Sequence, residues 1–338
     1  MTGKELALEC LAGRETERPV VICPTSIATT ESCVELGINF QDTHLNADKM
    51  AALAHYGASD LGFDSVMPYF SVIQEAAALG CDIKWGGPAE MPTQKNPPYK
   101  TPDDFTLPQD FLKRRSITTV LDALKLLKKD TGENTLIIGK AMGPWTLSYH
   151  LHGVEDTLFD SIVEPEQLHE FIRKFTEVTK IFAQAQFDAG ADIVTIADHI
   201  TADLTGAHVY KDFLMDAHRE IIKHLGGDRL ILHCCGNTVD RLTLFADAGW
   251  KTFHIDSKNN IQDALVAAQS MQLTGYVNNT DVLLKGSPTD VYAQVNEIIE
   301  NGIKLISPEC AVPLTVKNEN LAAIRQGVEH HVEWRDVK

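Results

Sequence analysis

The sequence has few cysteines, few basic residues and no long apolar run. Its seven cysteines are an odd number spread over 338 residues, which excludes a disulfide scaffold and predicts reduced thiols. Its 30 basic residues stand against 47 acidic ones, and the net charge of −17 disfavours nucleic acid or an anionic membrane surface as a partner. No stretch approaches the roughly 18 apolar residues of a membrane span, and the N-terminus does not resemble a signal peptide. We therefore expect a cytoplasmic protein.

The sequence does contain an alternation of short apolar runs with helical patterns. Alternation of this kind indicates βαβ units and a parallel sheet. Eight strands favour a single (β/α)8 TIM barrel over an open doubly wound sheet, which typically has about six strands. The run at 65–70 is the weakest, because Pro68 cannot donate to a ladder. The eight runs are residues 19–23, 65–70, 135–139, 193–198, 230–233, 252–256, 273–277 and 303–306.

The length of the chain is close to that of one α/β barrel. We expect a single domain over residues 1–338, with an N-terminal helical extension before the first strand. Residues 82–110 interrupt the alternation with the sequences Gly-Gly-Pro at 86–88 and Asn-Pro-Pro at 96–98. These breaks predict a long loop excursion near the barrel mouth, of the kind that often forms a lid.

Two strand ends carry side chains that commonly bind metal ions. His233 ends the fifth run, Cys234 and Cys235 follow it, and Cys310 follows the eighth run. A barrel places its active site at the carboxyl ends of its strands. Residues two apart in a strand face the same side, which pairs His233 with Cys235 and turns Cys234 away. One imidazole and two thiolates suit tetrahedral zinc with one open position. The spacing alone also allows a site without metal, in which His233 and Cys235 are ordinary strand-end residues and Cys310 is a small buried apolar residue.

The segment 232–237, Leu-His-Cys-Cys-Gly-Asn, together with Cys310 resembles the zinc motif of the methylcobamide:coenzyme M methyltransferases. These enzymes belong to the uroporphyrinogen decarboxylase superfamily of barrels, and the resemblance covers nearly the whole chain. It implies zinc on His233, Cys235 and Cys310, and methyl transfer between a small substrate and the cobalt of a corrinoid (cobalamin) presented by a separate carrier protein. The substrate is either a thiol such as coenzyme M or a methoxylated aromatic or other O-methyl donor, so the direction of transfer stays open.

The decarboxylases of this superfamily carry an arginine-rich signature after the first strand that holds a polycarboxylate porphyrin. Residues 24–30 of this chain are Pro-Thr-Ser-Ile-Ala-Thr-Thr, without arginine. Neutral hydroxyls cannot neutralise several carboxylates, which disfavours porphyrinogen decarboxylation. Two alternatives stay open: a decarboxylase or lyase of the superfamily that acts without metal, and a non-enzymatic protein that fills all four metal positions itself.

Four further residues are candidates for the site. Asp198 and Asp256 end the fourth and sixth runs, where a carboxylate would face the barrel mouth and orient substrate or a ligand histidine, and we expect them to be catalytic. Each could instead cap the next helix. Asn237 follows the ligand strand and could contact substrate or fix the turn. Tyr69, near the second strand end, could line the substrate pocket or pack in the core. We expect both to bind substrate.

Overall fold

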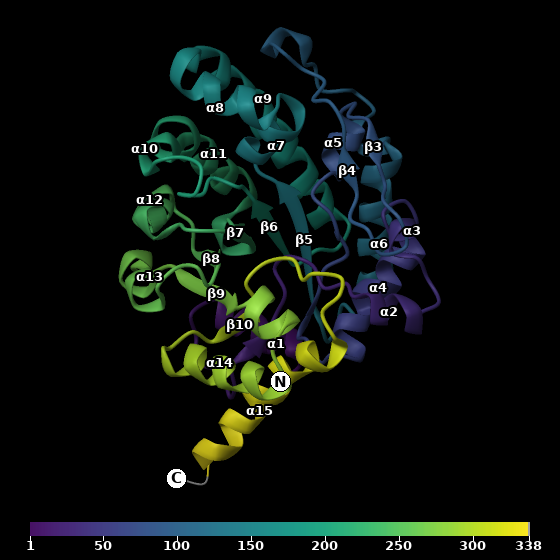
Figure 1. Cartoon of the computed structure of the whole chain (residues 1–338), viewed down its shortest axis with the longest axis vertical. Coiled ribbons are helices and arrows are strands. Elements are labelled where there is room, and N and C mark those ends of the chain that lie inside the picture. Colours follow the sequence, from purple (N-terminus) through teal and green to yellow (C-terminus); the bar gives the residue numbers. More distant parts are fainter. Residues whose placement is uncertain (337–338) are drawn as a thin grey trace.

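The computed structural model describes the backbone of residues 1–336 and the side chains of residues 1–332. Its eight strands are parallel and form a ring at the centre of the molecule (Figure 1). The strands pair in the order β1-β10-β9-β8-β7-β6-β5-β2. The backbone N–H of Asp64 donates to the carbonyl of Val21 (2.7 Å), which links β2 to β1 and nearly closes the ring. The predicted (β/α)8 barrel is confirmed. The barrel strands are β1 (Val20–Val21), β2 (Ser65–Val66), β5 (Leu136–Met142), β6 (Ile193–Ala197), β7 (Leu230–His233), β8 (Thr252–Ile255), β9 (Gln272–Val277) and β10 (Leu305–Pro308).

Helices surround the ring and present one apolar face to it. In α6, the buried residues Ile117, Val120, Leu124 and Leu127 recur at helical spacing, so one stripe of the helix packs inward. The helices are α1 (Gly3–Leu11), α2 (Thr30–Glu35), α3 (Phe40–Thr43), α4 (Ala47–Ser59), α5 (Gln74–Ala78), α6 (Arg115–Asp130), α7 (Pro144–Leu151), α8 (Val154–Val163), α9 (Pro165–Asp188), α10 (Ala207–Val209), α11 (Met215–Leu225), α12 (Val239–Ala248), α13 (Ile261–Ala268), α14 (Pro288–Glu300) and α15 (Asn318–Asp336). Short 3-10 or π segments are η1 (Pro102–Asp104), η2 (Phe111–Lys113), η3 (Tyr210–Leu214), η4 (Gly227–Arg229) and η5 (Asn279–Leu284).

All eight predicted strands are present, but some of their bounds differ from the expectation. The second strand is only Ser65–Val66, because the chain leaves the ladder before Pro68. The third barrel strand, β5, continues past Gly139 to Met142, and the last strand, β10, lies slightly later than predicted. The longer β5 carries Lys140 and Met142 into the barrel, where both line a cavity.

The excursion at 82–110 contains a small antiparallel hairpin that the sequence did not predict. Its strands are β3 (Ile83–Lys84) and β4 (Thr93–Gln94). Nε2 of Gln94 donates to the carbonyl of His150 (2.8 Å), and Oε1 of Gln94 lies 2.7 Å from Nδ1 of His150. These bonds fasten the excursion to α7 beside the barrel mouth.

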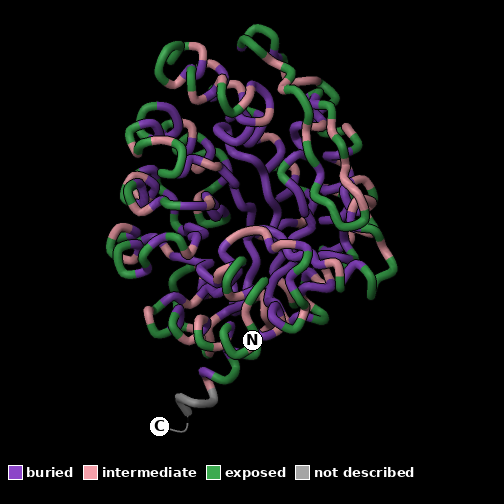
Figure 2. Tube along the Cα trace, viewed as in Figure 1, coloured by how far each residue is buried: buried purple, intermediate pink, exposed green. Residues whose placement is uncertain are grey.

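Burial follows the barrel plan. Figure 2 shows buried residues along the central strands and exposed residues on the outer sides of the surrounding helices. Among the described residues, no helix is both long enough and apolar enough to cross a membrane.

Candidate metal centre and cavity

Three side chains meet at the carboxyl ends of β7 and β10. His233 is the last residue of β7, while Cys235 and Cys310 each lie two residues beyond a strand end. Nε2 of His233 lies 3.1 Å from Sγ of Cys235 and 3.5 Å from Sγ of Cys310, and the two sulfurs are 2.7 Å apart. The fold thus brings together the three residues that the sequence predicts as zinc ligands, although 75 residues separate the two cysteines.

Cys234 lies outside this group. Its side chain is buried, and its Sγ contacts the carbonyl oxygen of Cys235 at 3.6 Å. Burial raises the pKa of the Cys234 thiol, which keeps it protonated and a poor metal ligand. The preference for Cys235 over Cys234 as a ligand therefore agrees with the position of both sulfurs.

The donor set is compatible with a divalent metal ion. The donor atoms of His233, Cys235 and Cys310 all lie within 4.8 Å of one another. The hydrogen bond between the two sulfurs holds the pKa of Cys310 well below its ordinary value and raises the pKa of Cys235. His233, Cys235 and Cys310 would hold the ion, and a set of one imidazole and two thiolates suits zinc with one position left open.

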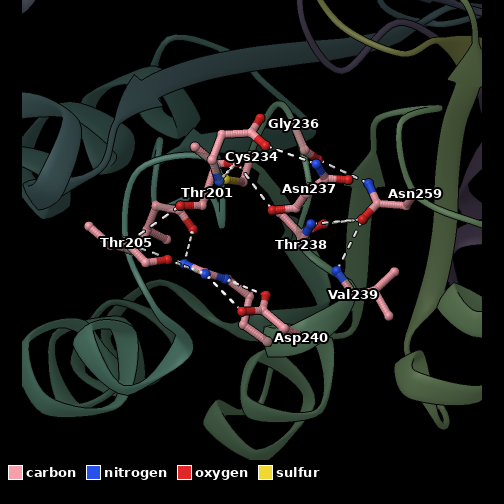
Figure 3. Close-up of polar contacts among 12 residues, drawn as sticks. Thr201, Thr205, Cys234, Gly236, Asn237, Thr238, Val239, Asp240 and Asn259 are labelled. Carbon is pink, nitrogen blue, oxygen red and sulfur yellow. Dashed lines mark hydrogen bonds and ion pairs between the residues drawn. The ribbon is translucent and has the colours of Figure 1, made fainter.

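The loop that carries Cys235 is held by Asn259 (Figure 3). Oδ1 of Asn259 accepts hydrogen bonds from the backbone N–H groups of Thr238 (2.7 Å) and Val239 (3.0 Å). Its Nδ2 donates to the carbonyl of Gly236 (3.0 Å). One side chain thus satisfies three backbone groups of the turn between β7 and α12, which limits the movement of Cys235.

Arg241 holds the adjacent loop after β6. Its guanidinium is fully buried and donates to the carbonyls of Ile200 (2.8 Å) and Thr205 (2.6 Å). It also forms an ion pair with Asp240 (2.9 Å). The segments that follow β6 and β7 are therefore fixed to each other at the rim of the barrel.

The carboxylate of Asp198 is occupied by protein groups. Its Oδ1 accepts from the backbone N–H of Thr146 (2.7 Å) in the first turn of α7, and its Oδ2 lies 3.0 Å from Nε2 of His218. Nε1 of Trp250 donates to Nδ1 of His218 (3.1 Å), so His218 carries its proton on Nε2 and donates it to Asp198. Asp198 lines the cavity, yet these contacts make it a support for α7, and its catalytic role stays a prediction.

Asp256 and Asn237 support the ligand loop. Oδ2 of Asp256 accepts from the backbone N–H of Gly236 (2.8 Å), and its Oδ1 accepts from that of Lys258 (2.9 Å). Asn237 is exposed, and its Nδ2 donates to Oδ1 of Asp203 (2.8 Å). Neither residue is among those that line the cavity. The contacts favour the turn-fixing alternative for Asn237. Asp256 binds backbone groups outside α13, so it does not cap that helix, and its catalytic role stays a prediction.

Tyr69 lies in the core. It is 0% exposed, its hydroxyl donates to the carboxylate of Glu75, and the same hydroxyl accepts from the backbone N–H of Gln74 (3.0 Å). Its ring faces the ammonium of Lys140, at 4.6 Å from the ring centroid. Tyr69 is absent from the residues that line the cavity, so its geometry favours the core alternative over substrate contact.

A cavity of about 500 Å³ opens beside the three donor atoms. Its wall is mainly apolar, which suits a small organic substrate. The wall also contains polar residues that the sequence did not identify as part of the site: Lys140, Tyr149, His150 and His199. Burial lowers the pKa of His199 and lowers that of His150 to about 4, so both imidazoles are neutral near pH 7.

Lys140 is the cavity residue that the sequence could most easily have identified. It interrupts the apolar strand Leu136–Met142 at an inward position, and a charged residue inside a buried strand is unusual. Burial lowers the pKa of Lys140 to about 8, an effect opposed most strongly by the negative charge of Cys310. The sequence could have flagged this lysine, but the expected strand stopped one residue before it.

Three comparisons place the chain among known proteins. The sequence profile of the uroporphyrinogen decarboxylase (URO-D) family matches residues 2–331. Methylcobamide:CoM methyltransferase MtbA of Methanosarcina acetivorans is 27% identical over 326 residues, which is 95% of each chain. Methylcobamide:CoM methyltransferase MtaA of Methanosarcina barkeri is 29% identical over 331 residues, 96% of each chain. A solved structure of a methyltransferase from Methanosarcina mazei superposes with a TM-score of 0.94 at 26% identity and covers 98% of this chain and 99% of that one.

Proposed function

We propose a function from the premise that this chain belongs to the uroporphyrinogen decarboxylase (URO-D) family. The chain is a methyltransferase that moves a methyl group between a small substrate and the cobalt of a corrinoid. The relatives named methylcobamide:CoM methyltransferases support the methyl-transfer role. A zinc ion on His233, Cys235 and Cys310, and a separate carrier protein that presents the corrinoid, complete the proposal.

One observation carries this proposal: an imidazole and two thiols from β7 and β10 converge at the edge of an apolar cavity. When bound there, zinc would supply a Lewis acid for the sulfur or oxygen atom that gains or loses the methyl group. The chain itself contributes the ligand loop that Asn259 holds, and a mainly apolar cavity wall. These features favour catalysis over a purely structural metal, because three protein ligands leave one position open.

The small substrate is either a thiol, which accepts the methyl group, or a methoxylated aromatic or other O-methyl donor. Both fit an apolar cavity of about 500 Å³. The alternative function is a decarboxylase or lyase of the same family that needs no metal. Among the described residues that line the cavity none is arginine, which disfavours a polycarboxylate substrate.

Metal analysis combined with a cobalt assay tests the proposal. Purified protein should contain about one zinc per chain, and a chelator should remove both zinc and activity. The protein is then mixed with methylcobalamin and a thiol, or with reduced cobalamin and a methoxyarene, while the cobalt spectrum is recorded. We expect a spectral change that requires zinc in one of the two mixtures.

Variants sharpen this test. His233→Ala should lose zinc, whereas Cys234→Ala should keep it, because the Cys234 sulfur lies outside the donor group. A metal-free preparation that turns over normally, or a fully active His233→Ala protein, would contradict the proposal and favour the metal-independent alternative.

A further inference from the structure

The cavity wall contains a buried lysine that has no carboxylate partner. Lys140 is 2% exposed and points inward from β5. Within the described part of the chain, no carboxylate forms an ion pair with its ammonium, and the Tyr69 ring is the contact on one side. The nearby carboxylate of Glu75 is already occupied by the Tyr69 hydroxyl and by the backbone N–H of Met142 (2.8 Å). An unpaired buried ammonium is costly, so its presence calls for a compensating anion.

The surroundings of Lys140 indicate where that anion lies. Lys140 lines the same cavity as His233, Cys235 and Cys310. The ammonium and the candidate metal centre therefore border one shared space. Since its pKa of about 8 lies above neutral pH, the side chain is mainly cationic there.

The charges at the metal centre would leave a bound substrate thiolate uncompensated. A divalent ion, the two cysteine thiolates and the neutral imidazole of His233 sum to zero. A substrate thiolate then adds one negative charge to an apolar cavity in which water screens poorly. Among the residues that line this cavity, Lys140 is the candidate cation, because His150 and His199 are neutral near pH 7.

We propose that Lys140 is an electrostatic positioning residue that compensates the negative charge of a substrate thiolate beside the metal centre. The inference rests on the proposed function. When the thiol binds, its S–H bond breaks, the electron pair stays on sulfur and the proton passes to the buffer. Lys140 favours this deprotonated form through its positive charge, and an opposite charge nearby typically shifts a pKa by one to three units.

The test measures thiol binding and proton release by the zinc-loaded protein. Calorimetry in two buffers of different ionisation enthalpy gives both the Kd and the number of protons released. The probes are 2-mercaptoethanol, whose substituent is neutral, and 3-mercaptopropionate, whose substituent is anionic. The variants are Lys140→Met and Lys140→Gln, which remove the charge, and Lys140→Arg, which retains it. Lys180→Met is the control, because Lys180 is also buried but is ion-paired with Glu177 on the outer helix α9.

We expect both neutral variants to bind both thiols at least tenfold more weakly and to release fewer protons, while zinc content is unchanged. Lys140→Arg should restore most of the affinity, and Lys180→Met should match the wild type. A loss confined to 3-mercaptopropionate would show that Lys140 binds a substituent instead, and this overturns the inference. Unchanged Kd and proton release in the neutral variants also overturn it. A wild-type protein that holds zinc yet binds neither thiol overturns the proposed function, and the inference with it.

Discussion

Gly236 offers a sensitive test of how the ligand loop is built. It follows Cys235 directly and has a φ of +85°, a left-handed conformation that costs a residue with a Cβ about 1–2 kcal/mol. A Cβ at this position would lie 2.4 Å from Oδ2 of Asp203 and 2.6 Å from Oγ1 of Thr201. Thr201 is buried and its hydroxyl donates to the carbonyl of Asn237 (3.1 Å), so it cannot move freely. Steric overlap of this kind destabilises the folded protein by a further ~1–3 kcal/mol.

Gly302 provides the matched control. Its φ is +89°, but nothing lies within 4 Å of the position its Cβ would take. Gly302→Ala should therefore show the backbone cost alone, and Gly236→Ala should be less stable than it by about 1–3 kcal/mol. Because the overlap is relieved by moving the loop, Cys235 should move with it. If this movement displaces Cys235 from the other two ligands, the affinity for zinc should fall ~10-fold or more.

Thermal unfolding of the metal-free proteins and competition with a chelator for zinc check both expectations. The reasoning would be refuted by a Gly236→Ala protein that matches Gly302→Ala in melting temperature and in zinc affinity. Equal loss of zinc affinity in both variants would equally contradict it, since Gly302 lies far along the chain from the ligand loop, between α14 and β10.

Three further substitutions test the roles of individual side chains. Cys310→Ala should lose zinc and methyl transfer but keep its circular dichroism spectrum, since barrel stability depends on the strand layers, and full activity would disprove the ligand assignment. Asp198→Asn weakens the bonds to His218 and Thr146 and should lower stability by about 1–3 kcal/mol with zinc retained. Loss of zinc at an unchanged melting temperature would instead support a direct role in the site. Tyr69→Phe removes the side-chain donor to the buried Glu75 carboxylate and should also lower the free energy of unfolding by about 1–3 kcal/mol. A raised KM at unchanged stability would instead support a substrate-binding role.

The sequence was sufficient for the architecture and for part of the site. Apolar runs of strand length recur between helical patterns, and this periodicity depends only on which residues face the core, so all eight barrel strands could be located. Strand alternation predicted that His233 and Cys235 share one side. The structure places the Cys235 sulfur beside the His233 imidazole and the Cys234 sulfur outside that group, although β7 ends at His233 and all three residues line the cavity.

Strand lengths and hydrogen-bond partners were less predictable, because they depend on neighbours that are distant in the sequence. Pro68 indicated that the second strand would be interrupted, yet β2 is still shorter than its apolar run. The strand β5 is longer than the apolar run that predicted it. Asp198 and Asp256 looked alike as strand-end carboxylates. Their partners, His218 in one case and the Gly236 backbone in the other, could not be read from local pattern.

Local sequence pattern was enough to order the strands and helices and to single out His233, Cys235 and Cys310 as candidate ligands. Only the tertiary structure decided that Cys310 lies within reach of His233, because the closure of the ring sets which strand ends become neighbours. It also decided that Lys140 faces the same cavity, since the stagger of adjacent strands determines the depth at which each inward side chain lies. Local periodicity specifies the face of a strand on which a residue lies, but proximity between residues on different strands comes from packing.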